Sequence, residues 1–335
     1  MIQKVVFMGT PDFAVGTLEA LVREGYEVLA VFSQPDKPKG RKKELAPTPV
    51  KAAAERFGLP VYQPERIRDP KWLTVLQDLN PDVIVVVAFG QLIPGAILEL
   101  PKYGCINVHA SLLPKYRGAA PIQWAVINGE EESGVTTMRM DAGLDTGDMI
   151  LKETVRLDEK ETGGSLFDKL SAVGAQLLVR TLKCVGDGTV VYEKQPEESP
   201  TPYAAMLKKE MGRIDWTKCA REIECLIRGL DPWPSAYTIY RGKTLKLWAA
   251  AVVEDQAADL KRNSDLSLQE KTNTAEGRLR EELCGTVAFV SKQALWIRTG
   301  SGLLSLREVQ PEGKKRMTID AFLRGYPVET GELLG

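Results

Sequence analysis

The chain has 335 residues, enough for two domains, and its 44% apolar and 27% charged residues give the balance of a globular protein with a normal core. Its formal net charge of −1 excludes a global positive field, so any RNA substrate would have to meet locally clustered cations. The N-terminus does not read as a signal peptide, and no apolar run approaches the roughly 18 residues of a transmembrane helix.

In the first half of the chain, strand-like and helical segments alternate. Apolar runs predict strands at residues 4–8, 26–32, 83–88 and 105–109, and later at 135–140 and 149–155. Helical spacing predicts helices at residues 11–24, 50–57, 71–79, 121–127 and 166–185. Because the strands are apolar runs rather than strict alternations, we expect an α/β fold with a mostly parallel sheet.

The composition changes near residue 190. Three prolines between 192 and 203 indicate an extended linker, so we divide the chain into a first domain at 1–189, a linker at 190–207 and a C-terminal domain at 208–335. In the last part, a helix at 217–228 precedes short strands at 244–250, 285–290, 294–299 and 302–308, whose glycine turns predict a small β-barrel. The polar segment 254–283 is expected to be a long charged loop between strands.

The cysteines and the single histidine limit which metal sites and which catalytic mechanisms the chain can have. Five cysteines are scattered and none forms a C-x-x-C pair, which indicates free thiols in a reducing cytoplasm and argues against a zinc or iron–sulfur framework. His109 is the only histidine, so a two-histidine metal site is excluded and we expect no metal. Any mechanism that needs an imidazole has to use His109.

The end of the strand at 105–109 carries the clearest chemistry. Asn107 and His109 are two residues apart, so they share one face of the strand at its carboxyl end, where α/β sheets place their ligand crevices. An amide can donate an N–H to a developing oxyanion, and an imidazole can move a proton, which suits a reaction at a carbonyl. From spacing alone, a purely structural role for both residues stays open.

A glycine-rich loop at 141–148 can bring a carboxylate to the imidazole and orient it. Asp145 is the preferred residue, and Asp141 and Asp148 compete with it. Because aspartates are also common turn formers, the loop by itself does not decide.

Two clusters of cations stand out. Residues 37–43 include five of them, interrupted by Pro38 and Gly40, so we expect neither helix nor strand there. The whole connection from 33 to 47 is long for a link between a strand and a helix, which indicates either a functional loop or a solvated one. The second cluster is at 314–316 in the C-terminal domain.

Taken together, the motifs resemble the folate-dependent formyltransferase family. The resemblance is carried by Asn107-x-His109, then Ser-Leu-Leu-Pro at 111–114, Arg117-Gly118 and Gly-Leu-Asp-Thr-Gly-Asp at 143–148. Segments at 7–14, 34–38, 213–216, 232–234 and 313–317 are similar in particular to the members that act on methionyl-tRNA. The resemblance covers nearly the whole chain.

The resemblance implies a fold, an activity and a set of residues. The fold is a Rossmann-like catalytic domain followed by an OB-like β-barrel that binds tRNA. The activity is transfer of the formyl group of 10-formyltetrahydrofolate to the α-amino group of methionine on initiator methionyl-tRNA, for translation initiation, by a protein that we expect to be a cytoplasmic monomer. The catalytic residues are Asn107, His109 and Asp145. The folate contacts are Ser111, Leu112, Leu113 and Pro114. The tRNA contacts are Lys37, Lys39, Arg41, Lys42, Lys43, Lys314, Lys315 and Arg316.

Other functions stay open at this point. The same chemistry suits a formyltransferase acting on a small amine such as an amino sugar nucleotide, although such a substrate needs neither cluster of cations. A non-catalytic RNA-binding protein would show no dependence on folate, and a hydrolase could use the same three residues on formyl-folate. The turn at Gly9-Thr10-Pro11 is not G-x-G-x-x-G, so no dinucleotide cofactor is expected.

Overall fold

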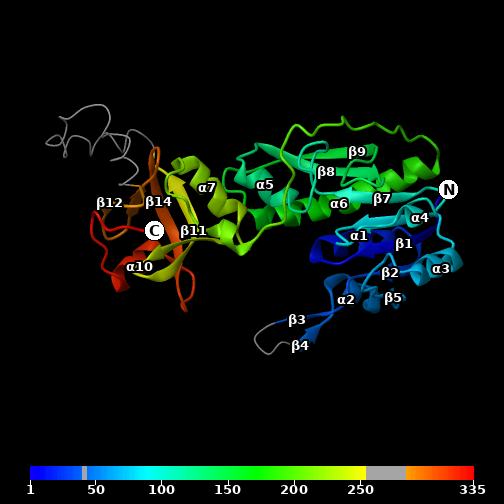
Figure 1. Cartoon of the computed structure of the whole chain (residues 1–335), viewed down its shortest axis with the longest axis horizontal. Coiled ribbons are helices and arrows are strands. Elements are labelled where there is room, and N and C mark those ends of the chain that lie inside the picture. Colours follow the sequence, from blue (N-terminus) through cyan, green and yellow to red (C-terminus); the bar gives the residue numbers. More distant parts are fainter. Residues whose placement is uncertain (40–43, 254–283) are drawn as a thin grey trace. The chain divides into compact units, whose positions relative to one another are not determined.

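A computed structural model gives the structure of residues 1–39, 44–253 and 284–335 (Figure 1). The chain forms two compact units. The first contains Met1–Ile122, Glu131–Leu157 and Ser165–Ala205, and the second contains Gln123–Glu130, Asp158–Gly164 and Met206–Gly335. The predicted loop at 254–283 lies outside the described residues. In the described parts of the chain, no helix is long and apolar enough to cross a membrane.

The first unit is built on a seven-stranded sheet in the order β5-β2-β1-β6-β7-β8-β9. Five strands pair in parallel: β1 (Lys4–Gly9), β2 (Glu27–Phe32), β5 (Val61–Tyr62), β6 (Val83–Val87) and β7 (Cys105–His109). The last two run antiparallel: β8 (Glu132–Arg139) and β9 (Met149–Arg156). The predicted α/β fold with a mostly parallel sheet is therefore confirmed.

Helices cover both faces of this sheet, which explains why β6 is buried along its whole length. They are α1 (Asp12–Arg23), α2 (Pro49–Arg56), α3 (Pro70–Leu79), α4 (Gly95–Leu98) and α6 (Gly163–Gly186). A further helix, α5 (Pro121–Ile127), belongs to the second unit from Gln123 onward. On one face, α3 and α4 pack against β1, β6 and Cys105 of β7. On the other face, α6 approaches Val108 of β7, where a Cβ on Gly174 would lie 3.0 Å from a valine methyl.

The prediction that residues 37–43 contain no strand is wrong for its first part. Residues Lys37–Lys39 form β3, which pairs antiparallel with β4 (Glu44–Ala46), and Pro38 lies opposite Leu45. Proline is tolerated because this two-stranded ribbon has only edge strands, where a missing N–H can face solvent. Residues 40–43 lie outside the described part of the chain.

The second unit is an antiparallel sheet in the order β10-β11-β14-β13-β12, with β15 paired to β14. Its strands are β10 (Ala236–Tyr240), β11 (Lys243–Val252), β12 (Val287–Val290), β13 (Leu295–Arg298), β14 (Leu303–Pro311) and β15 (Met317–Thr318). The helices are η1 (Lys209–Gly212), α7 (Ala220–Gly229) and α10 (Ile319–Gly325). Leucines and isoleucines from the strands form its core with Ile223 and Ile227 of α7 and Phe322 of α10.

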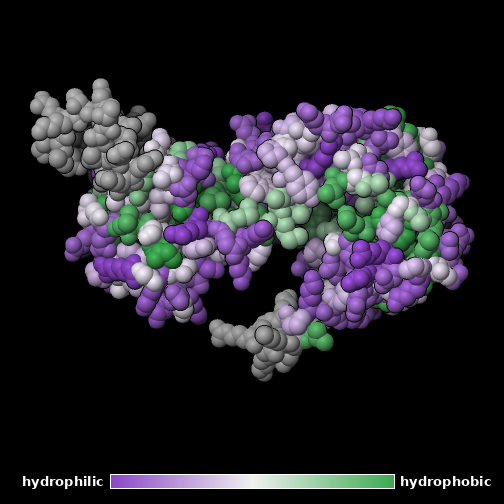
Figure 2. All heavy atoms as spheres, viewed as in Figure 1, coloured by the Kyte–Doolittle hydropathy of each residue, from purple (hydrophilic) through white to green (hydrophobic). Residues whose placement is uncertain are grey.

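The C-terminal residues join the two edges of this antiparallel sheet. The Gly335 N–H donates to the Ile239 carbonyl of β10 at 2.8 Å, and the Leu334 N–H donates to the Gly285 carbonyl, just before β12, at 2.8 Å. The small β-barrel domain predicted for the last part of the chain is an antiparallel β-sheet domain in the structure, and its strands β10 and β15 were not predicted. In the view of Figure 2, hydrophilic residues dominate the described surface, with apolar side chains in smaller groups.

Candidate active site

Strand β7 delivers two polar side chains to one face of the first sheet. Asn107 and His109 alternate with Ile106 and Val108, and the two polar residues are only 8% and 6% exposed. The Asn107 amide makes no side-chain hydrogen bond to any residue of 1–39, 44–253 or 284–335. Among the described residues the amide is not one of the fully buried polar groups left without a partner, so it reaches solvent and its N–H groups are available to a bound molecule.

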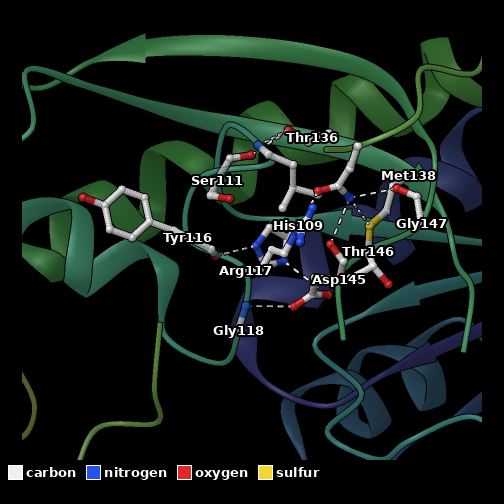
Figure 3. Close-up of polar contacts among 12 residues, drawn as sticks. His109, Ser111, Tyr116, Arg117, Gly118, Thr136, Met138, Asp145, Thr146 and Gly147 are labelled. Atoms are coloured by element: carbon white, nitrogen blue, oxygen red, sulfur yellow. Dashed lines mark hydrogen bonds and ion pairs between the residues drawn. The ribbon is translucent and has the colours of Figure 1, made fainter. Parts of the chain in front are cut away.

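His109 is held from two sides (Figure 3). Its Nε2 lies 3.0 Å from the Tyr116 carbonyl oxygen, and its Nδ1 lies 3.7 Å from Oδ1 of Asp145. Because a carbonyl oxygen only accepts, Nε2 carries a proton when the contact to Tyr116 is made. Nδ1 is then the ring nitrogen that faces the Asp145 carboxylate.

The loop after β8 presents Asp145 in a left-handed conformation, with φ of +58°. For a residue other than glycine, that conformation costs on the order of 1–2 kcal/mol, so neighbouring contacts must hold it. One such contact is the 2.9 Å hydrogen bond that the Gly118 N–H donates to Oδ2 of Asp145 (Figure 3). Asp145 is 22% exposed and approaches the imidazole from the rim of the site.

The two competing aspartates take other places. The Asp141 carboxylate accepts hydrogen bonds from the Thr146 hydroxyl and the Gly143 N–H, so it shapes the loop. The backbone carbonyl of Asp148 accepts from the Arg139 N–H at the end of β8. Of the three carboxylates, the structure places Asp145 beside His109.

Residues 193–204, which we call the strap, cross this site; from the sequence they were predicted only as part of the linker at 190–207 and not as part of the site. The strap begins with a two-way backbone pairing between Glu193 and Met149 and ends where Ala204 pairs with Arg117 and Ala119. Between these points, the Gln195 side chain donates to the carbonyls of Asp145 and Gly147. The only signal in the sequence was the proline content, which indicates an extended chain whose backbone groups need partners elsewhere.

The segment predicted to contact folate is partly used by the protein itself. Ser111 is fully buried, and its hydroxyl donates to the Lys115 carbonyl at 2.6 Å. Leu113 packs in a small cluster with Met138 and Met149. Leu112 and Pro114 are partly accessible, so a ligand would meet this segment mainly through those two side chains.

The predicted tRNA contacts differ in their surroundings. Lys37 is exposed at the start of β3, with its Nζ 3.2 Å from Oε1 of Gln34. Arg41, Lys42 and Lys43 lie outside the described residues. In the second unit, Lys314 and Lys315 are exposed on the turn after β14.

Arg316 is different because carboxylates already neutralise it. Its guanidinium pairs with Glu308 and with Asp231, and it lies over the ring of Trp248 at 5.1 Å. Burial raises the pKa of Asp231, and the nearby Arg316 opposes that rise. We therefore expect a weaker phosphate contact from Arg316 than from the two lysines.

The Cys105 thiol is the next reactive group on strand β7. Burial raises the pKa of the Cys105 thiol, on the same strand as Asn107, to about 12, so it stays protonated at neutral pH and is no nucleophile. Among the described residues, no group of three or more histidine, cysteine or acidic side chains could hold a metal ion.

Comparison with known proteins decides the family. A family model described as formyl transferase matches residues 3–182, and one described as formyl transferase, C-terminal domain, matches residues 206–327. The chain belongs to the formyltransferase family.

Formyltransferases whose names state their substrate are similar to this chain over nearly its full length. The methionyl-tRNA formyltransferase of Agathobacter rectalis is 55% identical over 328 residues, which cover 98% of each chain. That of Lachnospira eligens is 54% identical over 332 residues and 99% of each chain. A solved N-formyltransferase from Helicobacter canadensis, in complex with folinic acid and dTDP-3-aminofucose, aligns with a TM-score of 0.64 over 92% of this chain and all of its own. At 18% identity, that likeness concerns the fold.

Proposed function

We propose that this formyltransferase moves the formyl group of 10-formyltetrahydrofolate to the α-amino group of methionine on initiator methionyl-tRNA, in the cytoplasm. The observation that carries the proposal is the unpartnered Asn107 amide, within the described residues, beside the His109–Asp145 pair at the carboxyl end of β7. Relatives that bear the name methionyl-tRNA formyltransferase, similar over 98–99% of both chains, support the choice of acceptor.

The folate supplies a formyl group bound to nitrogen, and the chain's own residues do the rest. As the methionine nitrogen attacks the formyl carbon, the Asn107 N–H stabilises the charge that grows on the formyl oxygen. His109, held at Nε2 by Tyr116, exchanges a proton at Nδ1 next to Asp145. The new carbon–nitrogen bond forms, the bond to the folate nitrogen breaks, and the proton lost by the amine ends on that nitrogen.

The proposed acceptor tRNA would bind to local clusters of cations, which the small net charge of the whole chain does not reveal. We assign phosphate contacts to the cations of residues 37–43, of which Lys37 and Lys39 belong to β3, and to Lys314 and Lys315 after β14. A small amine would use neither cluster. The domain division at 190–207 and the barrel-like second half as a tRNA-binding domain belong to this proposal.

The test is direct. The purified protein is incubated with 10-formyltetrahydrofolate and either initiator methionyl-tRNA or an amino sugar nucleotide, and the products are identified by mass spectrometry. We expect formylmethionyl-tRNA from the first and no product from the second, with no transfer by His109→Ala. A formylated sugar without formylmethionine would replace the proposal by the small-amine alternative.

A further inference from the structure

We propose that Gln195 is a positioning residue for formyl transfer, acting by holding the turn that presents Asp145 to His109. The inference deepens the site described above and rests on the function proposed for it. Gln195 does not touch the reacting atoms in this assignment, and it acts through Asp145.

The first support is the way Gln195 binds the turn. Its Nε2 donates to the Asp145 carbonyl at 2.9 Å and to the Gly147 carbonyl at 2.8 Å, so its two short hydrogen bonds are both to one turn. A longer contact of 3.9 Å joins the same nitrogen to Sδ of Met138 in β8. The turn has little room to shift by itself. A Cβ on Gly147 would lie 1.9 Å from the Arg139 carbonyl oxygen of β8, which shows how closely the two backbones approach.

The second support is that Gln195 is itself fixed in one orientation. Its Oε1 accepts a 3.0 Å hydrogen bond from Nε of Arg117. The other guanidinium nitrogens of Arg117 donate to the carbonyls of Pro196 and Glu197, at 2.7 and 3.1 Å. Because a guanidinium only donates and a carbonyl only accepts, the amide cannot turn over without breaking its hydrogen bonds to Arg117, Asp145 and Gly147.

The third support is that Gln195 links the two segments whose residues contact the imidazole; Figure 3 labels Tyr116, Arg117, Gly118 and Asp145 around His109. Three consecutive residues contribute: the Tyr116 carbonyl contacts His109, Arg117 binds Gln195, and the Gly118 N–H binds Asp145. Gln195 joins this segment to the turn that carries Asp145. Removing the Gln195 amide therefore loosens the carboxylate that faces Nδ1 without removing any group that takes part in the proposed reaction.

The test uses a replacement of nearly equal size. In Gln195→Glu, the carboxylate can still accept a hydrogen bond from Arg117. It has no N–H to donate to the carbonyl oxygens of Asp145 and Gly147, so the turn is no longer held. Gln195→Ala removes the hydrogen bonds to Arg117, Asp145 and Gly147 together. The matched control is Lys194→Gln, the neighbouring exposed strap residue, which changes the net charge by the same −1 as Gln195→Glu.

Two measurements are made at one pH. The first is kcat and KM for formyl transfer to methionyl-tRNA. The second is the pair of ring ¹⁵N chemical shifts of His109, which need no assignment because the chain has one histidine. We expect both Gln195 variants to lower kcat by roughly 10- to 100-fold, with a much smaller change in KM, and to shift the imidazole signals. Lys194→Gln should change neither.

The outcomes separate the two proposals. Shifted imidazole signals in the Gln195 variants would support the positioning role. If the wild-type protein at the same time formylates an amine other than that of methionyl-tRNA, the result would contradict methionyl-tRNA as the acceptor. Unchanged signals and unchanged kcat in folded Gln195 variants would overturn the positioning role, whatever the acceptor. If neither Gln195 variant folds, the residue is structural and the proposal is wrong.

Discussion

Asn107 and Thr137 are buried polar residues of neighbouring strands, and they differ in what their side chains bind. The Asn107 amide has no partner in the described residues, whereas the Thr137 hydroxyl bonds to the Thr181 hydroxyl at 2.8 Å and accepts from the Leu151 N–H. We expect Asn107→Ala to lower kcat by about 10²–10³ while changing the free energy of unfolding by less than about 1 kcal/mol. Thr137→Val should do the reverse, costing about 1–2 kcal/mol of stability with a near-normal rate.

Denaturant unfolding and single-turnover rates measure both quantities on the same preparations. A destabilisation of Asn107→Ala equal to that of Thr137→Val, with an unchanged rate, would return Asn107 to a structural role.

At the scale of elements, the two edges of the antiparallel sheet depend on the C-terminal segment. Glu332 accepts hydrogen bonds from the Tyr240 hydroxyl at 2.8 Å and from Arg241, next to the point where Gly335 binds β10. Burial, followed by the hydrogen bond to Glu332, raises the pKa of Tyr240 to about 12. The unfolded phenol ionises near pH 10, so this contribution to stability is complete below about pH 10 and is lost as the pH rises toward 12.

The expected result is a fall in the unfolding temperature between pH 10 and 12 that is larger in the wild type than in Tyr240→Phe. Thermal scans followed by circular dichroism across that range make the comparison, with Tyr237→Phe as the control on the same strand. Parallel pH curves for wild type and Tyr240→Phe would show that this phenol does not couple the sheet edges.

Elements and site residues were predictable from the sequence to different degrees. Strand β6, with five consecutive valines and isoleucines, and strand β7, which carries Asn107 and His109, follow from local apolar patterns. The choice of Asp145 over Asp141 and Asp148 does not follow from a local pattern. It depends on hydrogen bonds from the Gly118 N–H and from Gln195, which are 27 and 50 residues away in the sequence. Strand β3 was missed since its pairing with β4 outweighs the weak strand preference of a Lys-Pro-Lys sequence.

For the whole molecule, the formal net charge of −1 means that the proposed tRNA binding would come from clustered cations rather than from a general attraction. If residues 41–43 bind phosphates, replacing Arg41, Lys42 and Lys43 with alanine should weaken tRNA binding. It should also flatten the salt dependence of tRNA binding by roughly 0.9 in the log–log slope for each phosphate that the variant no longer neutralises.

The control variant also removes three positive charges from the first unit. It replaces Arg56, Arg180 and Lys183, which are surface cations already paired with glutamates. Dissociation constants measured from low to moderate salt for wild type and both triple variants give the slopes. A smaller slope in the first variant alone assigns the effect to direct phosphate binding, because a long-range field would respond to both. Equal slopes in all three proteins would remove this cluster from the tRNA interface and favour a small amine as the acceptor.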